Sequence, residues 1–172
     1  MSTLNHDPKT LNRTKTVTID RIFPFPVETT WKAWSQPESF KKWWGPKGFT
    51  CPHCTIDFKV GGTNLSSMKS PDEKEFWSLM RFLEIIPNKK IKYIDSFADS
   101  KGNEVTPDYY DMPGDWANEL IVTVTFQDEN GKTRFHLTHE GIPKEMVNDC
   151  TDGWQQSFDK LEQNFKSEAY GK

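Results

Sequence analysis

The stretch KEMVNDCTDGWQQSFDKLEQNFK, residues 144–166, decides the fold. Its apolar side chains recur at intervals of three and four: Met146, Val147, Cys150, Trp154, Phe158, Leu161 and Phe165. That spacing places them on one side of an α-helix of about six turns. Gly153 inside this helix costs about 1 kcal/mol relative to alanine, which suggests close approach of another backbone or of a ligand. The sequence therefore predicts a long amphipathic helix that covers an apolar surface.

Much of the chain before this helix alternates apolar and polar residues, as β-strands do. The clearest strand is 119–127, and the turn at 128–131, which ends in Asn-Gly, returns the chain antiparallel. Residues 75–86 are apolar at both sets of alternating positions, which predicts a central strand covered on both faces. Further strands are predicted at residues 16–23, 49–58, 64–69, 92–97 and 133–140, with short helices at 28–35 and 37–42.

This order of elements predicts the fold class. Strands joined by turns form an antiparallel sheet, and only the helix at 144–166 is long enough to cover one of its faces. We expect an α+β fold in which a curved antiparallel sheet wraps around the long C-terminal helix, with two short helices after strand 1. A curved sheet rarely closes fully around one helix, so a cavity is expected between them.

The same patterns predict one domain with two tails. The domain is expected over residues 15–166. Residues 1–14 contain no apolar run and are expected to be a disordered N-terminal tail. Residues 167–172 are polar and are expected to fray as a C-terminal tail.

Composition limits the classes of partner. The 172 residues carry 22 Lys and Arg against 25 Asp and Glu, a net charge of −3. This balance disfavours binding to nucleic acid or to an anionic membrane. No run approaches the ~18 apolar residues of a membrane span, and no signal-peptide pattern begins the chain, so a cytoplasmic location is expected. The 7 Trp, 4 Tyr and 12 Phe carry much of the hydrophobic content, and Trp31 and Trp34 are expected to be core residues. If other aromatic residues line a cavity, the predicted partner is a small hydrophobic molecule.

The segment Cys51-Pro-His-Cys54 has the spacing of a metal-binding or redox motif. A zinc site normally needs four ligands, and no second pair of this kind follows. Residues three apart on a strand also point to opposite faces. The odd total of 3 cysteines argues against a disulfide framework. We therefore predict ordinary thiols and no metal or cofactor.

A long aperiodic segment at 98–118 is unusual for an idle connection. A loop with buried aromatic residues that caps a cavity is the favoured interpretation, and a disordered acidic insertion is the alternative. The walls of the cavity are expected to come from this loop, the strands and the long helix. The predicted lining residues are Phe82, Tyr93, Tyr110, Met112, Phe126, Phe135, His139, Trp154, Phe158 and Leu161.

Candidate catalytic groups are few. His139 shares a strand face with Phe135 and Leu137, so it is expected to point inward, where Asp57 or Glu84 could be its partner in proton transfer. A histidine that is satisfied within the core is the interpretation we favour. The chain has no glycine-rich phosphate loop and no nucleophile elbow. No catalytic residue is assigned, and an enzyme is the least supported class.

Several short motifs carry a resemblance to a known family. They are Trp-Lys-Ala-Trp at 31–34, Phe-Lys-Lys-Trp-Trp-Gly-Pro at 40–46, Asp-Phe-Lys-Val-Gly-Gly at 57–62, Met-Pro-Gly at 112–114, His-Glu-Gly at 139–141 and Gly-Trp at 153–154. In this order the set resembles the START-like (SRPBCC) superfamily, in particular its heat-shock-protein-90 ATPase-activator-like branch. The resemblance covers about residues 16–165 and implies the helix-grip fold, START-like or birch-pollen-allergen-like.

Three functions remain open from the sequence. The first is binding of a small hydrophobic or amphipathic ligand between the C-terminal helix and the sheet. The second, implied by the resemblance, is a cochaperone-like protein that binds and stimulates the heat-shock protein 90 ATPase, with Trp43, Trp44 and Lys47 as the partner surface. The eukaryotic relatives add an N-terminal domain, for which residues 1–14 are too short, and this weakens the chaperone hypothesis. The third is a cyclase- or hydrolase-like enzyme that uses His139. A monomer and a homodimer are both compatible with the sequence.

Overall fold

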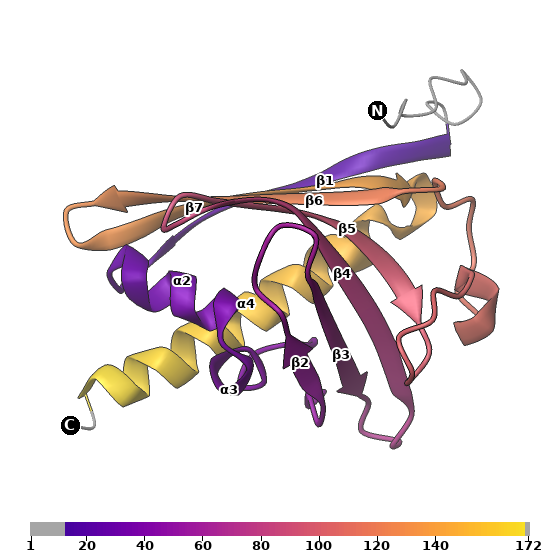
Figure 1. Ribbon diagram of the computed structural model, residues 1–172, viewed down its shortest axis with the longest axis horizontal. Coiled ribbons are helices and arrows are strands. Elements are labelled where there is room, and N and C mark those ends of the chain that lie inside the picture. Colours follow the sequence, from indigo (N-terminus) through magenta and orange to yellow (C-terminus); the bar gives the residue numbers. More distant parts are fainter. Residues whose placement is uncertain (1–12, 171–172) are drawn as a thin grey trace.

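The computed structural model describes residues 13–170, and the strands within them form one antiparallel sheet (Figure 1). Its seven strands lie in the order β1-β7-β6-β5-β4-β3-β2. The strands are β1 (Thr14–Phe23), β2 (Cys54–Ile56), β3 (Thr63–Lys69), β4 (Glu75–Ile86), β5 (Lys90–Ala98), β6 (Leu120–Glu129) and β7 (Lys132–Pro143). The helices are α2 (Val27–Ser35), α3 (Pro37–Phe40), α4 (Val147–Tyr170) and the short 3-10 turns η1 (Pro107–Tyr110) and η2 (Lys144–Met146).

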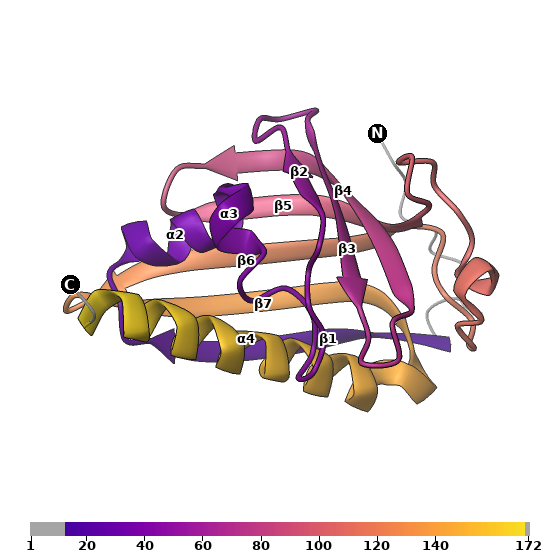
Figure 2. The same cartoon turned by 90° about the horizontal axis from the view of Figure 1, so that it is seen from below.

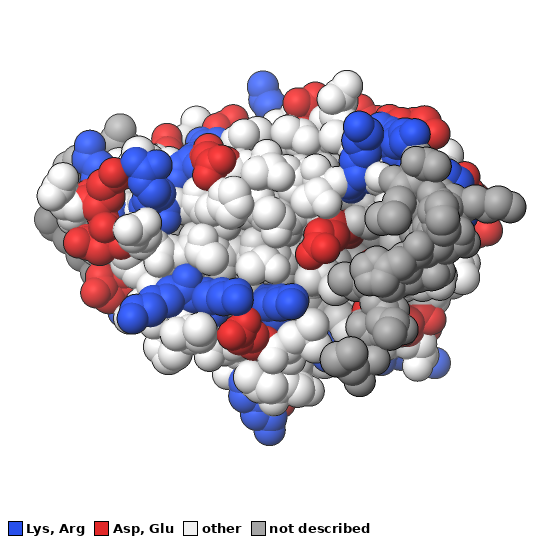
Figure 3. All heavy atoms as spheres, turned by 90° about the horizontal axis from the view of Figure 1, so that it is seen from above, with Lys and Arg blue, Asp and Glu red and all other residues white. Residues whose placement is uncertain are grey.

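The sheet curves over α4, which runs along its concave side, and α2 and α3 lie on that same side (Figures 1 and 2). The predicted α+β helix-grip fold is thereby confirmed. No helix within residues 13–170 combines the length and the apolar character needed to cross a membrane. The opposite, convex face of the sheet shows Lys and Arg interspersed with Asp and Glu around an uncharged area (Figure 3).

The hairpin of β6 and β7 forms as its sequence predicts. Asn130 and Gly131 both adopt positive φ, 54° and 85°, as a two-residue hairpin turn requires. The register pairs Phe126 with Phe135, so the alternating apolar residues of both strands face α4. This face is buried, because Phe126 is 4% exposed and Phe135 is 0% exposed.

Strand β4 has the predicted bounds, but the expectation that both of its faces are covered is wrong. Met80 and Phe82 are buried, whereas Leu83 is 40% exposed. The helices cover only the concave side of the sheet, so the convex side of β4 meets solvent (Figures 1 and 2). A register shift between Phe82 and Glu84 also marks a bulge here, which explains why the apolar residues do not alternate cleanly.

Both edges of the sheet differ from the predicted bounds. The strand expected at 49–58 is reduced to β2, which begins only after Pro52, since proline has no N–H for the ladder. Strand β1 begins at Thr14, within the range expected as the N-terminal tail, and α4 runs to Tyr170. Residues 1–12 and 171–172, which make up the rest of the predicted tails, lie outside the described residues.

Polar contacts hold α4 against the sheet and against the loop that follows α3. On β1, Arg21 donates from Nη2 to Asp159 Oδ1 at 2.7 Å and from Nη1 to Gln155 Oε1 at 2.9 Å. Lys160 Nζ donates to the carbonyl of Phe49 at 2.9 Å and lies within 3.4 Å of the carbonyl of Trp44. These contacts fix the direction of α4 and hold the loop beside it.

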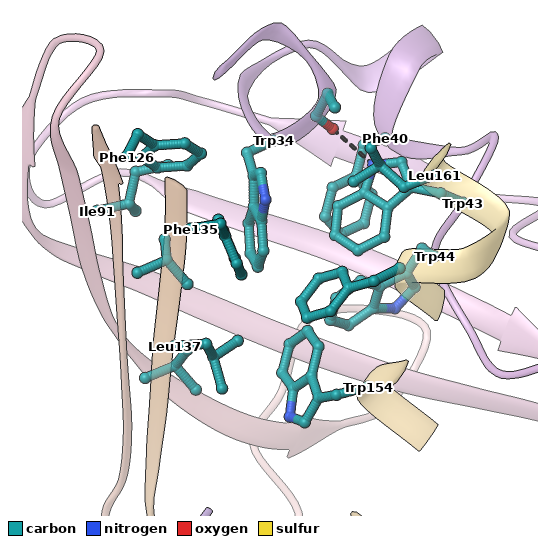
Figure 4. Close-up of a cluster of buried hydrophobic side chains, with 14 of the residues drawn as sticks. Trp34, Phe40, Trp43, Trp44, Ile91, Phe126, Phe135, Leu137, Trp154 and Leu161 are labelled. Carbon is teal, nitrogen blue, oxygen red and sulfur yellow. Dashed lines mark hydrogen bonds between the residues drawn. The ribbon is translucent and has the colours of Figure 1, made fainter. Parts of the chain in front are cut away.

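Aromatic rings fill the interior where α2 meets the sheet and the middle of α4 (Figure 4). Phe135 lies at the centre, with its ring centroid 5.0 Å from that of Phe158 and 6.0 Å from that of Trp34. Trp43 is completely buried and donates its indole N–H to the carbonyl of Ala33 at 2.8 Å, the dashed line in Figure 4. We call this region the packed end of the interior.

Candidate functional site

A cavity of about 360 Å³ occupies the other end of the interior. It lies between the N-terminal half of α4 and the concave face of β4, β5 and β7, and the loop between β5 and β6 contributes to its wall. The aromatic and thioether side chains that line it are Trp44, Phe49, Met68, Phe76, Trp77, Phe97, Met112, Trp116, Met146 and Trp154. The polar side chains that line it are Ser78, Asp95, Ser96, His139, Asp149, Cys150 and Ser157. A concave, mostly apolar site with a few convergent polar groups has the usual character of a ligand pocket.

Three elements meet at His139 on the inner wall. His139 belongs to β7 and is 6% exposed. Asp95 comes from β5, and its Oδ2 lies 3.3 Å from His139 Nε2. Cys150 and Trp154 are one helical turn apart on α4, so both reach the other ring nitrogen. Trp154 Nε1 lies 3.1 Å from His139 Nδ1, and Cys150 Sγ lies 3.7 Å from it.

The Trp154 contact fixes the tautomer of the neutral imidazole. The indole N–H can only donate, so Nδ1 of His139 must offer a lone pair. We therefore assign the ring proton to Nε2, on the side of Asp95. Nε2 is fully buried and makes no well-aligned hydrogen bond with any described residue, although Asp95 is close. The Nε2–H group of His139 and the carboxylate of Asp95 thus both lack a well-aligned hydrogen bond with each other at the cavity wall.

The protonation of His139 is set by opposing effects. Burial lowers the pKa of His139, but the nearby carboxylate of Asp95, together with the thiol of Cys150, outweighs it and raises the pKa to about 9. The Trp154 N–H acts in the opposite direction, because it stabilises the form with a free lone pair. Behind this group lies the Tyr93 hydroxyl, which is buried without a hydrogen-bond partner among the described residues, and burial raises its pKa.

This geometry supports recognition better than nucleophilic catalysis. A base that activates the Cys150 thiol would have to accept its proton at Nδ1 of His139. That lone pair already accepts the N–H of Trp154, at a shorter distance than Cys150. Asp57 and Glu84, the carboxylates considered from the sequence, lie at the surface and pair with Lys59 and Lys90.

The structure divides the predicted lining residues between the two ends of the interior. Met112, His139 and Trp154 line the cavity. The packed end holds Phe82, Tyr93, Phe126, Phe135, Phe158 and Leu161, all buried and outside the cavity lining. The apolar side of α4 borders both ends of the interior. The rings of Trp34, from α2, and of Trp43, from the segment after α3, fill the packed end. Tyr110 lies outside the lining as well, where its hydroxyl donates to the carbonyl of Ala98 and accepts from the N–H of Trp77.

The predicted partner surface requires a correction. Trp43 is 0% exposed and Trp44 is 6% exposed, so neither presents its ring to a protein partner. The chain stops its helix before these residues, and both rings turn inward, Trp43 to the packed end and Trp44 to the cavity. Only Lys47 of the predicted surface is exposed.

Sequence reasoning missed Asp95 and most of the aromatic wall. Asp95 was readable in principle, since it alternates with Tyr93 and Phe97 on β5 and so shares their inward face. Gly153 lines the cavity, but no backbone presses against it, because a Cβ there would meet Pro46 Cγ at 3.8 Å, an ordinary contact. Of the two explanations expected for this glycine, close approach of a backbone is therefore wrong.

The cysteines of the Cys51-Pro-His-Cys54 segment have the environment of ordinary thiols. Burial raises the pKa of Cys51 to about 12 and that of Cys54 to about 11. Cys51 donates to the carbonyl of His53 at 3.4 Å. Within residues 13–170, no group of three or more His, Cys, Asp or Glu side chains is arranged to hold a metal ion.

Comparison with known proteins identifies a family that matches most of the chain. The model of the family described as Activator of Hsp90 ATPase homolog 1-like protein matches residues 24–166. No curated protein matches the sequence.

Solved structures share the fold at low sequence identity. A protein from Chromobacterium violaceum is 25% identical with a TM-score of 0.69, over 86% of this chain and 94% of that one. One from Arthrobacter aurescens is 21% identical with a TM-score of 0.73, over 93% and 88%. One from Silicibacter pomeroyi is 19% identical with a TM-score of 0.70, over 90% and 99%.

Proposed function

The chain belongs to the Activator of Hsp90 ATPase homolog 1-like family, and from this premise we propose that it binds a small hydrophobic or amphipathic molecule between α4 and the sheet. The observation that carries the proposal is the cavity of about 360 Å³ with aromatic walls. The cavity is only partly enclosed, so a ligand can enter it from solvent. A hollow of this size beside a tightly packed aromatic region is what a ligand site requires.

The magnitude of the interaction is adequate for binding without any covalent step. A flat ligand that buries about 300 Å² of apolar surface gains about 7 kcal/mol before the costs of association. The polar groups at His139 and Asp95 would then orient the ligand.

Thermal unfolding in the presence of neutral probes tests the proposal. Indole, 1-naphthol and tryptophol should raise the Tm in a concentration-dependent way, since binding to the native state adds RT ln(1 + [L]/Kd) to its stability. Phe97→Ala removes a ring from the cavity wall and should weaken the effect. Tyr109→Ala removes an exposed ring outside the lining and should leave it unchanged. The proposal is wrong if no probe raises the Tm, or if both variants respond as the wild type does.

The family description favours a second candidate, a cochaperone that stimulates the heat-shock protein 90 ATPase. The burial of Trp43 and Trp44 removes the surface that the sequence offered for it. We therefore expect the purified protein to leave the chaperone's ATPase rate unchanged. A saturable stimulation by wild-type protein would make this second function the correct one.

A further inference from the structure

The charged side chains that line the cavity are unusual for a hydrophobic-ligand site. Asp95 and Asp149 contribute carboxylates and His139 contributes an imidazole, whereas no Lys or Arg belongs to the described lining. With a neutral imidazole the lining carries two negative charges, and with a protonated one it still carries one net negative charge. Among the lining side chains themselves, an anionic ligand would therefore face a net negative charge in either state.

Asp95 is the charge that calls for an explanation. Its side chain is only 20% exposed, and among the described residues its one ion-pair partner is His139 at 3.3 Å. The buried Nε2 of that histidine makes no well-aligned hydrogen bond. A buried carboxylate is costly unless it is paired and hydrogen-bonded. Because the Asp95 oxygens accept no well-aligned hydrogen bond from His139, they keep the capacity to accept hydrogen bonds from a ligand.

Asp149, unlike Asp95, has a structural reason for its charge, which is its position at the start of α4. It is exposed in the first turn of α4, where an acidic residue stabilises the helix dipole. It also borders the cavity, so it would attract a cation toward Asp95. The ammonium group of Lys160 binds the carbonyls of Trp44, Pro46 and Phe49, three residues that line the cavity, so its positive charge offsets part of this field. Its side chain does not belong to the lining, so it offers the ligand no ammonium group there.

The walls supply a matching surface for a cation on a flat body. Four of the seven tryptophans, Trp44, Trp77, Trp116 and Trp154, line the cavity. Indole faces attract ammonium groups and stack on flat apolar ligands. Given the proposed function on which this inference rests, we propose that the cavity selects a cationic amphipath, a protonated amine on an aromatic or aliphatic body, with Asp95 accepting the ammonium hydrogen bonds.

The size of the cavity suggests the probes. At about 30 Å³ for each water-sized group, the hollow holds roughly a dozen non-hydrogen atoms. Tryptamine, tryptophol and indole-3-acetate share one indole body of about this size and differ in carrying an ammonium, a hydroxyl or a carboxylate. At pH 7 the amine is protonated, as a lysine side chain is.

Isothermal titration calorimetry at pH 7 and low salt, with these three probes, tests the proposal. Tryptamine should bind about tenfold more tightly than indole-3-acetate, and more tightly than tryptophol. Asp95→Asn should weaken tryptamine about tenfold and change tryptophol by less than about threefold. Asp149→Asn should weaken tryptamine more than Asp152→Asn, which removes an exposed charge of the same helix outside the lining.

The outcomes separate this inference from the function on which it rests. If tryptophol or indole-3-acetate binds as tightly as tryptamine, the choice of a cation is wrong and the ligand site stands. If none of the three binds, both proposals are overturned. If Asp95→Asn does not fold by circular dichroism, the wild-type ranking and the comparison of Asp149→Asn with Asp152→Asn decide. Equal losses in those two variants would indicate a general surface field and overturn the inference.

Discussion

Trp154 donates its indole N–H to Nδ1 of His139 at 3.1 Å, and this bond joins the long helix to the sheet at the cavity wall. Two residues fifteen apart in the chain thus meet because β7 leads into α4 through the short turn η2. The bond fixes which ring nitrogen faces Asp95, and it places a tryptophan face along the cavity. The position of α4, the tautomer of His139 and the shape of the cavity wall therefore depend on one another.

The first prediction concerns this bond. Trp154→Phe removes the donor that stabilises the unprotonated ring, so the pKa of His139 should rise relative to the wild type. Above pH 9, where the ring is neutral, the variant should also lose about 1–3 kcal/mol of stability, because the Nδ1 lone pair is left buried with only the weak thiol of Cys150 nearby. NMR titration of the His139 imidazole carbons measures the shift. A pKa that stays constant or falls would show that the indole does not donate to this nitrogen.

The second prediction concerns stability against pH. The folded pKa of His139, about 9, lies above its ordinary value of 6.5, so the folded state binds more protons between these values. Its contribution to the free energy of unfolding is therefore complete below pH 6.5 and is lost as the pH rises through 9. The raised pKa values of Cys51 and Cys54 also lower the free energy of unfolding from about pH 8 upward, where unfolded thiols begin to ionise, and this loss is the same with or without His139.

Urea unfolding of the wild type and of His139→Gln at pH 6, 7.5 and 9 measures this contribution. The stability difference between the two proteins should shrink steadily across that window. Parallel pH profiles would contradict the raised pKa.

The third prediction separates the two ends of the interior. Phe135→Ala opens a void among the rings of the packed end and should cost about 3–5 kcal/mol. Met112→Ala enlarges a space that already exists and should cost less than about 1 kcal/mol. Denaturant unfolding gives both values. Similar losses in the two variants would mean that the interior has no such division.

The fourth prediction uses the thiols as reporters of occupancy. Cys150 lines the cavity, whereas the raised pKa values of Cys51 and Cys54 leave little thiolate at pH 8. N-ethylmaleimide should therefore modify Cys150 first, and a cavity-bound probe should slow that reaction. Mass spectrometry locates the adduct, with Cys150→Ser as the control. Faster modification of Cys51 or Cys54 would refute this order.

The regular elements were largely readable from the sequence, because their periods are local. The three-and-four spacing around Trp154 predicts α4, and Asn130-Gly131 predicts the hairpin that precedes it. The motifs that resemble the START-like superfamily agree with the family match and with the helix-grip fold. The apolar–polar alternation around Pro52 predicted too long a strand, because the alternation continues where proline prevents the backbone from pairing with its neighbour.

The site was readable only in part, because periodicity says which side chains turn inward and not what fills the space they enter. His139 and Trp154 line the cavity, but Phe126 and Phe135, with the same inward orientation, meet the rings of α2 and α4 instead. Which end stays hollow depends on how the segment after α3 folds over the sheet. The contact of Asp95 with His139 likewise depends on the spacing of three strands.

The proposed ligand site is tested most directly by NMR of the tryptophan indole N–H groups. Unlabelled tryptophol is titrated into protein labelled with nitrogen-15 on tryptophan. The resonances of Trp44, Trp77, Trp116 and Trp154, which line the cavity, should shift together with one dissociation constant, while those of Trp31 and Trp43 should hardly move. If the cavity resonances stay in place at saturating probe, or the shifts fall on Trp31 and Trp43, the cavity between α4 and the sheet is not a ligand site.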